Sequence, residues 1–144
     1  MIMTKKLDVY LANLAVNLVK LHNLHWNVVG KTFKQAHEYL EEMYDEVFEK
    51  YDVYAEYQKM AGVYPKASMK EYLEIATIKE LESRDYNLQE TFRIVLDDIN
   101  LMRDLALEVR KEADENGEFN LVAMMEDEVA SYNKKIWFIE SMLK

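Results

Sequence analysis

The sequence predicts an all-α fold: a four-helix bundle with one short additional helix in its longest connection. Glycine occurs three times and proline once among 144 residues, so few positions interrupt a helix. Apolar residues recur in alternating steps of three and four over four separate blocks, which is the spacing of near-antiparallel bundle helices. Because no internal repeat, low-complexity tract or linker divides the chain, we expect residues 1–144 to form a single domain.

Two long helices are predicted in the first part of the chain. The apolar stripe of the first consists of Leu7, Leu11, Leu14, Leu18 and Leu21. The stripe of the second consists of Leu40, Tyr44, Val47, Tyr51 and Tyr54. Gly30 is placed to end the first helix, and Thr32 with Gln35 has the spacing of a capping box that starts the second. Gly62 and Pro65 end the second helix.

A connection of about 25 residues follows, which is too long for a tight hairpin. Within it, Ser68 and Glu71 have the spacing of a capping box, so we expect a short amphipathic helix over residues 68–77 on an outer face. The third long helix begins within residues 83–88, and a break at residues 116–117 precedes the fourth. The third stripe consists of Leu88, Phe92, Val95, Ile99, Met102, Ala106 and Val109. The fourth consists of Val122, Met125, Val129, Tyr132, Ile136, Ile139 and Leu143.

The composition excludes several classes of function. The net charge is -9 at pH 7, and the only basic element near the N-terminus is Lys5 with Lys6. A protein that holds nucleic acid through its phosphates needs a basic surface or tail, so DNA binding is not expected. The absence of cysteine excludes a thiolate metal site and suits a cytoplasmic location. No run of roughly 20 apolar residues is present and the first residues lack a secretion signal, so we expect no membrane span.

All three histidines lie within residues 22–37. His25 extends the stripe of the first helix, and His37 stands at the start of the second. If the chain turns near Lys31, each is six residues from the corner, so antiparallel packing brings both to a similar height on facing helices. A histidine on an apolar face is more often a core residue than a ligand, and spacing alone leaves both interpretations open. His22, one turn before His25, is either a further ligand or a surface residue.

The sequence excludes the common di-iron centre of four-helix bundles. That centre uses Glu-x-x-His on two helices. The residues three positions before the histidines are Val19, His22 and Lys34, none of which is glutamate. Three histidines without cysteine also fit a structural zinc site poorly.

Acidic residues crowd the second predicted helix, and most should form a solvated face. They are Glu38, Glu41, Glu42, Asp45, Glu46, Glu49, Asp52 and Glu56. Asp52 and Glu56 are one turn apart and lie off the apolar stripe, so they should face something outside their own bundle. His37 and Asp52 are 15 residues apart, which is about 22 Å along a helix, whereas metal–ligand bonds are about 2 Å.

Within one chain His37 and Asp52 therefore cannot bind the same ion. They can do so if two second helices pack antiparallel about a two-fold axis near Tyr44–Asp45. Each His37 then meets Asp52 of the partner subunit and Glu56 of the partner subunit. A two-fold axis repeats the arrangement, which gives two equivalent sites per dimer.

The histidines and the acidic pair stand in a longer, specific pattern. Its elements are His25-Trp26-Asn27-Val28, Gly30, Phe33, His37-Glu38 and Asp52-x-x-Ala55-Glu56. Gly62–Pro65 and the segment KEYLEIATI follow farther along the chain. This pattern resembles the Dps family of mini-ferritins (DNA-binding proteins from starved cells) in the ferritin-like superfamily, and the resemblance covers nearly the whole chain.

The resemblance implies a ferroxidase centre with one or two irons, formed by His25 and His37 of one chain and by Asp52 and Glu56 of its two-fold mate. It implies an enzyme that oxidises Fe(II), favouring hydrogen peroxide over oxygen, and that stores ferric mineral in a hollow dodecamer built of two-fold dimers. Such a protein limits hydroxyl-radical formation and so protects against oxidative stress. The alternatives are a related cage that binds another divalent metal with little ferroxidase activity, and a helical interaction module without metal.

The chain departs from the family's pattern at several positions. Tyr57 stands where many relatives have arginine, and the Lys-rich tail that many relatives use to bind DNA is not found. Glu118 and Asp127 match two acidic positions of the family's iron-entry pore, or belong to a merely solvated helix start, and Ala123 stands where aspartate is common. Trp26 is most simply a packing residue, with the alternative of an electron donor that quenches radicals.

Overall fold

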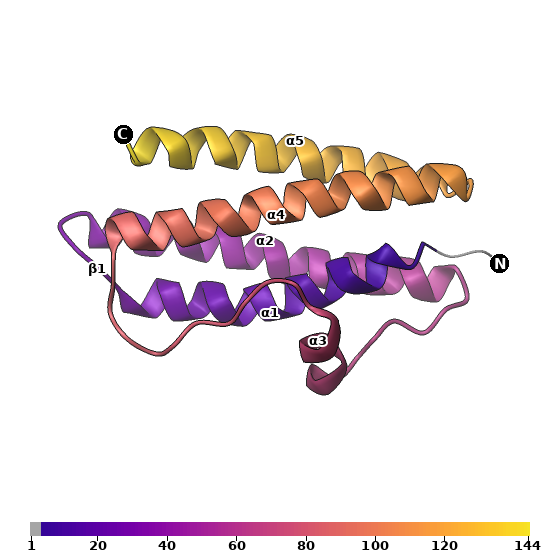
Figure 1. Ribbon diagram of the computed structural model, residues 1–144, viewed down its shortest axis with the longest axis horizontal. Helices are drawn as coiled ribbons and strands as arrows, with labels where there is room; N and C mark the ends of the chain where they lie inside the picture. The colour runs from indigo at the N-terminus through magenta and orange to yellow at the C-terminus, as the bar shows by residue number, and fades with distance from the viewer. Residues whose placement is uncertain (1–3) are drawn as a thin grey trace.

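A computed structural model describes residues 4–144, which form five helices and two short strands (Figure 1). The helices are α1 (Lys6–Asn27), α2 (Phe33–Met60), α3 (Met69–Ile75), α4 (Leu88–Glu115) and α5 (Phe119–Met142). The strands are β1 (Val28–Val29) and β2 (Tyr86–Asn87). The predicted all-α four-helix bundle with a short additional helix is therefore confirmed. Residues 1–3 of the expected domain lie outside the described residues.

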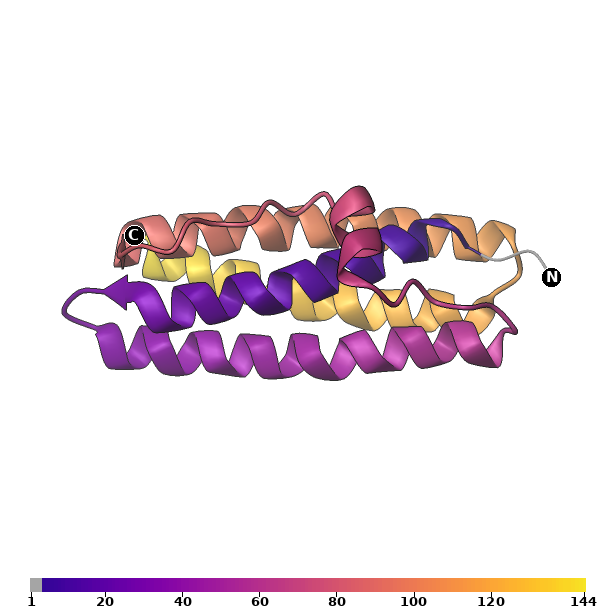
Figure 2. The ribbon, with the colours of Figure 1, turned by 90° about the horizontal axis from the view of Figure 1, so that it is seen from below.

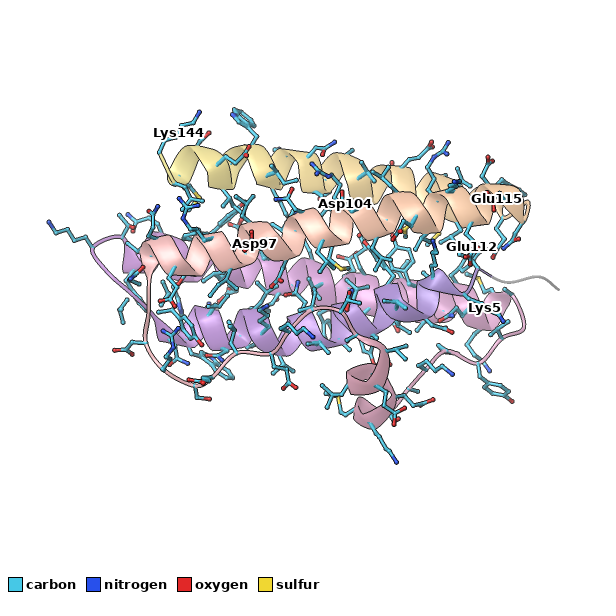
Figure 3. The ribbon with its side chains drawn as sticks, viewed as in Figure 1. Lys5, Asp97, Asp104, Glu112, Glu115 and Lys144 are labelled. Atoms are coloured by element: carbon cyan, nitrogen blue, oxygen red, sulfur yellow. The ribbon has the colours of Figure 1, made fainter. Side chains whose placement is uncertain are left out.

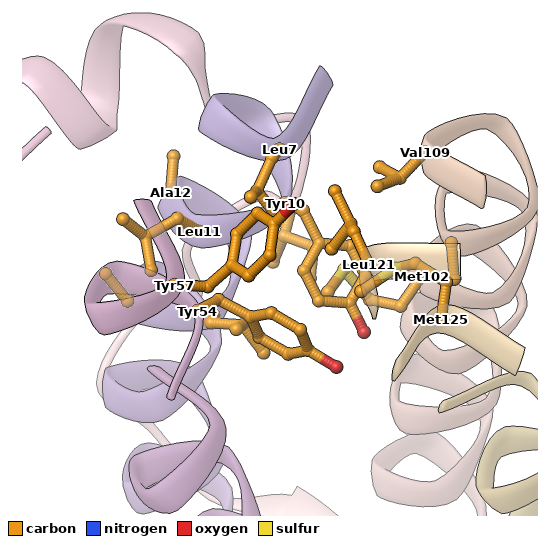
Figure 4. Close-up of a cluster of buried hydrophobic side chains, with 14 of the residues drawn as sticks. Leu7, Tyr10, Leu11, Ala12, Tyr54, Tyr57, Met102, Val109, Leu121 and Met125 are labelled. Carbon is orange, nitrogen blue, oxygen red and sulfur yellow. The ribbon is translucent and has the colours of Figure 1, made fainter. Parts of the chain in front are cut away.

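The four long helices run side by side as two hairpins, α1 with α2 and α4 with α5 (Figure 1). As predicted, the connection between α2 and α4 passes along the outside of the bundle, and α3 packs across α1 (Figure 2). Two clusters of buried side chains fill the interior. The first includes Leu7, Tyr10, Tyr54, Met102 and Met125 (Figure 4). The second includes Leu21, Leu40, Phe92, Ile99 and Ile139.

Charged side chains cover the outer surface of the bundle, as Asp97, Asp104 and Glu115 on α4 illustrate (Figure 3). This distribution follows from the helical period, because the apolar stripe of α4 turns inward and the polar positions between its members turn outward. In the described part of the chain, no helix combines the length and the apolar character that crossing a lipid bilayer requires.

The helix starts confirm one predicted capping box and contradict the other. The Ser68 hydroxyl accepts from the Glu71 backbone N–H at 3.3 Å and donates to the Glu71 carboxylate at 2.9 Å. Thr32 precedes α2 but makes no side-chain capping bond, so the predicted Thr32–Gln35 box is wrong. The reason is the backbone, since an N-cap residue needs an extended conformation, and Thr32 has ψ 35° where Ser68 has ψ 149°. Helix α3 also ends at Ile75, two residues before the predicted end.

A short parallel strand pair fixes the corner between α1 and α2. Helix α1 ends at Asn27 rather than at Gly30, and the next two residues, β1, pair with β2 directly before α4. Gly30 has φ +144°, a region that only glycine adopts readily. A Cβ atom at this position would lie 2.6 Å from Leu88 Cδ1. Gly30 therefore does not terminate the first helix but allows the corner to approach the start of α4.

We expect Gly30→Ala to lower the free energy of unfolding by about 3 kcal/mol, since it adds backbone strain to a steric clash with Leu88. Gly117→Ala is the matched control, because Gly117 has φ +72° and a Cβ there would meet no atom within 4 Å. That control should lose only about 1 kcal/mol. Urea unfolding of both variants measures the difference. Equal losses in the two variants would show that the close approach to Leu88 does not affect the free energy of unfolding.

A buried ion pair joins α1 to α4. The Lys20 ammonium lies 2.6 Å from the Asp98 carboxylate, and the two side chains are only 5% and 14% exposed. Burial raises the pKa of Asp98 above its ordinary value, although the Lys20 charge acts in the opposite direction. The pair holds two charges in the interior, where either charge without its partner would lower the free energy of unfolding.

Candidate metal centre

His25, in the last turn of α1, and His37, in the first turns of α2, face each other across the corner. Their rings are stacked with centroids 3.6 Å apart and planes inclined by 14°. The expectation that antiparallel packing brings the two histidines to the same height is therefore confirmed. His25 is 5% exposed, and His37 is intermediate.

Reciprocal hydrogen bonds orient the two rings. His25 Nδ1 lies 2.7 Å from the His37 carbonyl oxygen, and His37 Nδ1 lies 2.8 Å from the His25 carbonyl oxygen. A carbonyl oxygen only accepts, so both Nδ1 atoms must carry the proton and donate. Each Nε2 atom then presents its lone pair, which is the form of histidine that binds a metal ion.

Glu41 completes a group of three potential ligands with His25 and His37. One ligand atom from each residue lies within 4.8 Å of the others, and Glu41 Oε1 is 3.9 Å from His25 Nε2. Two imidazoles and one carboxylate suit ferrous iron. Glu41 stood among the acids that were expected to form a solvated face, so the sequence did not predict its place in this group. The signal was its place one turn after His37, which puts both on one face of α2.

Asp52 and Glu56 do not approach the histidines within the chain. Both are exposed, and α2 is an unbroken helix from Phe33 to Met60, which holds them far from His37. The fold of one chain therefore brings together His25, His37 and Glu41. It leaves Asp52 and Glu56 exposed to solvent farther along α2. Whether these acids serve a partner's centre stays a prediction.

The face of α2 between these two groups carries an exposed aromatic residue. Residues 41, 45, 48 and 52 follow one another in steps of four and three and so share one side of the helix. Phe48, in the middle of this series, is 64% exposed. A large apolar side chain flanked by candidate ligands marks this side of α2 as a surface that can bury area against another molecule.

His22 and Trp26 lie beside the centre without joining it. The His22 ring stacks on Tyr44 with centroids 3.8 Å apart, and its Nδ1 bonds the Leu18 carbonyl oxygen at 2.7 Å. His22 is not part of the three-residue group found in the described chain. Trp26 is 67% exposed, and its ring centroid is 5.5 Å from that of His22, so within this chain it is not a core packing residue.

Glu118, at the start of α5, is held within its own chain and is not merely solvated, whereas the pore role of Glu118 and Asp127 stays a prediction. The Glu118 carboxylate accepts hydrogen bonds from the Thr4 backbone N–H at 3.0 Å, from the Thr4 hydroxyl, and from the Tyr57 hydroxyl at 2.9 Å. Glu118 is thus engaged inside its own chain, whereas Asp127 is exposed. Burial, together with the Glu118 carboxylate, raises the pKa of Tyr57. Tyr57, in the position after Glu56, therefore connects the end of α2 to the start of α5.

Comparisons with known proteins agree with this fold. Residues 4–144 match the family described as the ferritin-like domain. The DNA protection during starvation protein of Brevibacillus brevis is 35% identical over 135 residues, 92% of this chain and 89% of that protein. Antigen TpF1 of Treponema pallidum is 32% identical over 140 residues, 97% of this chain and 79% of that protein. The crystal structure of a Dps protein from Bacillus brevis superposes with TM-score 0.93 at 33% identity, covering 96% of this chain and 93% of that one. The crystal structure of Helicobacter cinaedi CAIP gives TM-score 0.94 at 30% identity, covering 98% and 99%.

Proposed function

This chain belongs to the Dps family of ferritin-like proteins, the iron-storing mini-ferritins, and from this premise we propose that it is a ferroxidase. It oxidises Fe(II) with hydrogen peroxide at sites between paired subunits and deposits the ferric product inside a hollow homo-oligomer. The observation that carries the proposal is the pair of stacked histidines whose Nε2 atoms stay free beside the Glu41 carboxylate.

The residues suit ferrous iron as a substrate. Imidazole nitrogen from His25 and His37 favours Fe(II), and carboxylate oxygen from Glu41 favours the ferric product. Two Fe(II) ions supply the two electrons that reduce one hydrogen peroxide to the level of water, so no hydroxyl radical is released. The four protons set free when the ferric product hydrolyses leave to solvent.

We propose that Asp52 and Glu56 of the partner subunit complete each site. Two α2 helices that pack antiparallel about an axis near residues 44–45 bring His37 of one chain to the acids of the other. This arrangement also buries the exposed Phe48, which lies on the same face. A two-fold pair has two such sites, and dimers of this kind are the building unit of the dodecamer that we propose. The single domain over residues 1–144 and the cytoplasmic location stay predictions.

Complementation tests whether the site is shared between chains. A variant with His25→Ala and His37→Ala and a variant with Asp52→Ala and Glu56→Ala should each lack the fast phase of Fe(II) oxidation. After the two are refolded together in equal amounts, half of the dimers are mixed, and each mixed dimer has one complete site. About a quarter of the parental fast-phase amplitude should therefore return. Stopped-flow absorbance of the ferric product measures it.

The control is a mixture of the two variants assembled separately, which should show no recovery. If the co-refolded mixture stays as slow as its components, the site is not built across a two-fold pair. If the Asp52 and Glu56 variant alone keeps the parental rate, these acids are not ligands.

The alternative is a related cage that binds another divalent metal with little ferroxidase activity. One observation favours it: the residue after Glu56 is Tyr57, whose side chain carries no positive charge and donates its hydroxyl to Glu118, so this position supplies no cation next to Glu56. The two functions differ in the rate of peroxide consumption per Fe(II) added, which is high for the ferroxidase and low for the alternative. DNA binding is not proposed, because the net charge is -9.

A further inference from the structure

A cluster of tyrosines surrounds one buried carboxylate between α1, α2 and α5. The Glu128 side chain is almost fully buried, and its Oε2 atom accepts a hydrogen bond of 2.6 Å from the Tyr10 hydroxyl. The Tyr132 hydroxyl lies 2.6 Å from the Tyr10 hydroxyl and 3.3 Å from Glu128 Oε2. The Tyr54 ring meets the Tyr10 ring edge-on with centroids 5.4 Å apart (Figure 4). None of these groups takes part in the metal centre.

The hydrogen bonds of this cluster have a direction. Each phenol has one hydroxyl proton, and Tyr10 uses it to donate a hydrogen bond to the carboxylate, which can only accept while ionised. Tyr132 then donates to the Tyr10 oxygen, its closer contact at 2.6 Å, in preference to Glu128 Oε2 at 3.3 Å. Lys50 Nζ lies 3.5 Å from Glu128 Oε1 and supports the charge of the carboxylate. Tyr10 therefore stands between a hydrogen-bond donor and a base.

The buried phenols are held in their neutral form. Burial raises the pKa of Tyr10 well above its usual value, and the nearby Tyr132 and Glu128 raise it further. Burial and the Glu128 charge likewise raise the pKa of Tyr132. A neutral phenol that loses an electron becomes a strong acid. Its oxidation is therefore easiest where a base already accepts a hydrogen bond from the hydroxyl and can take up the proton.

We propose that Tyr10 is a proton-coupled redox site, at which loss of one electron is accompanied by transfer of the phenolic proton to Glu128. The products are a neutral tyrosyl radical and a protonated Glu128, and the Tyr132 hydroxyl hydrogen-bonds the radical oxygen. The electron reduces a hydroxyl radical, which with one proton from solvent becomes water. This oxidant rests on the proposed function, because one Fe(II) that reacts alone with hydrogen peroxide yields Fe(III), hydroxide and a hydroxyl radical.

The cluster is close to the ligands that α2 offers to a partner. Tyr54 lies between Asp52 and Glu56 in sequence and points to the opposite, buried side of the same helix. The two sides of a helix are separated by about 10 Å. An electron can thus pass from Tyr10 through Tyr54 towards iron held at Asp52 and Glu56.

A second tyrosine pair in the molecule serves as a matched control. The Tyr51 and Tyr72 hydroxyls are 2.7 Å apart, and their rings meet edge-on with centroids 5.9 Å apart. Tyr10 makes the same two kinds of contact, one with Tyr132 and one with Tyr54. Tyr72 donates instead to the Lys66 carbonyl oxygen at 2.6 Å. A backbone carbonyl is a far weaker base than a carboxylate. The radical should therefore form at Tyr10 and not at Tyr72, although each of these tyrosines packs edge-on against a tyrosine of α2.

The first experiment oxidises the metal-free assembled protein with azide radicals generated by pulse radiolysis. Tyrosyl radical is followed by its absorbance and, after rapid freezing, by electron paramagnetic resonance. We expect Tyr10→Phe and Glu128→Gln each to lose most of the long-lived tyrosyl signal, whereas Tyr72→Phe keeps it. Tyr132→Phe should keep the signal but shift its g-tensor, since the radical loses its hydrogen-bond donor. The same signal in Tyr10→Phe as in the parent, or no long-lived signal in the parent, would overturn the proposal.

The second experiment adds Fe(II) below one ion per site, followed by hydrogen peroxide. Tyr10→Phe should oxidise Fe(II) at the parental rate but accumulate less tyrosyl radical and more oxidised surface residues. Slow Fe(II) oxidation in the parent would contradict the proposed function, while the azide experiment would still decide the role of Tyr10. The two failures are therefore distinguishable.

Discussion

Replacing His25 and His37 by alanine together is expected to slow the fast phase of Fe(II) oxidation by at least about 100-fold, because metal sites respond to the loss of even supporting groups by 10- to 100-fold. The substitution removes two of the three ligand atoms that the chain brings within 4.8 Å of one another. The remaining ligands, Glu41 and the proposed acids of the partner subunit, are all carboxylates, so the variant has lost the imidazole nitrogens that suit Fe(II). Stopped-flow absorbance with equimolar hydrogen peroxide measures the rate.

The matched control is His22→Ala, on the same helix one turn away and outside the ligand group. It should keep the fast phase. Size-exclusion chromatography and thermal unfolding should show that the double variant is folded and assembled, since most of the core of α1 lies away from the corner. A double variant that oxidises Fe(II) at the parental rate would show that the centre lies elsewhere.

A loss of stability as large as that of Gly30→Ala is expected from Lys20→Met, which should lower the free energy of unfolding at neutral pH by about 3 kcal/mol. The variant leaves the Asp98 carboxylate in the interior without its partner 2.6 Å away. Adding Asp98→Leu to the same chain should recover most of the loss, because neither charge is then buried. Urea unfolding of the single and double variants measures both values.

The loss should also depend on pH. Burial already raises the folded-state pKa of Asp98, and removal of the Lys20 charge raises it further. A carboxyl group whose folded pKa exceeds its unfolded value, about 3.9 for aspartate, lowers the stability of the fold increasingly as the pH rises from the unfolded to the folded pKa, and by a constant amount above it. The deficit of Lys20→Met should therefore be small near pH 4, grow as the pH rises towards the folded pKa of the variant, and level off above it. A deficit that does not change with pH would mean that lost packing, and not the unpaired charge, is the cause.

The sequence predicted what depends on local periodicity. The four stripes, the break before α5 and the Ser68–Glu71 cap are decided by residues within a few turns of one another. The heights of His25 and His37 followed from counting residues to the corner. The Thr32–Gln35 box failed because the chain must turn from β1 into α2 there, which fixes the Thr32 backbone in a conformation that capping does not use.

The remaining features depend on contacts between distant parts of the chain. Tyr10 and Glu128 are 118 residues apart, and Thr4 and Glu118 are 114 apart. No spacing rule connects such positions, because the packing of α1 against the second hairpin determines them. Glu41 could have been found from its step of four after His37, but it stood among eight acids on one helix. The role of Asp52 and Glu56 needs a second molecule and stays a prediction.

The crossed bonds between each imidazole and the other histidine's backbone have a thermodynamic consequence. The rotameric freedom of both side chains is lost when the chain folds, and not when an ion arrives. Binding then costs little conformational entropy, which favours capture of an ion that is present at low concentration. The same rigidity means that successive ions meet an unchanged pair of nitrogen atoms, so the hairpin behaves as a template that is reused at each turnover.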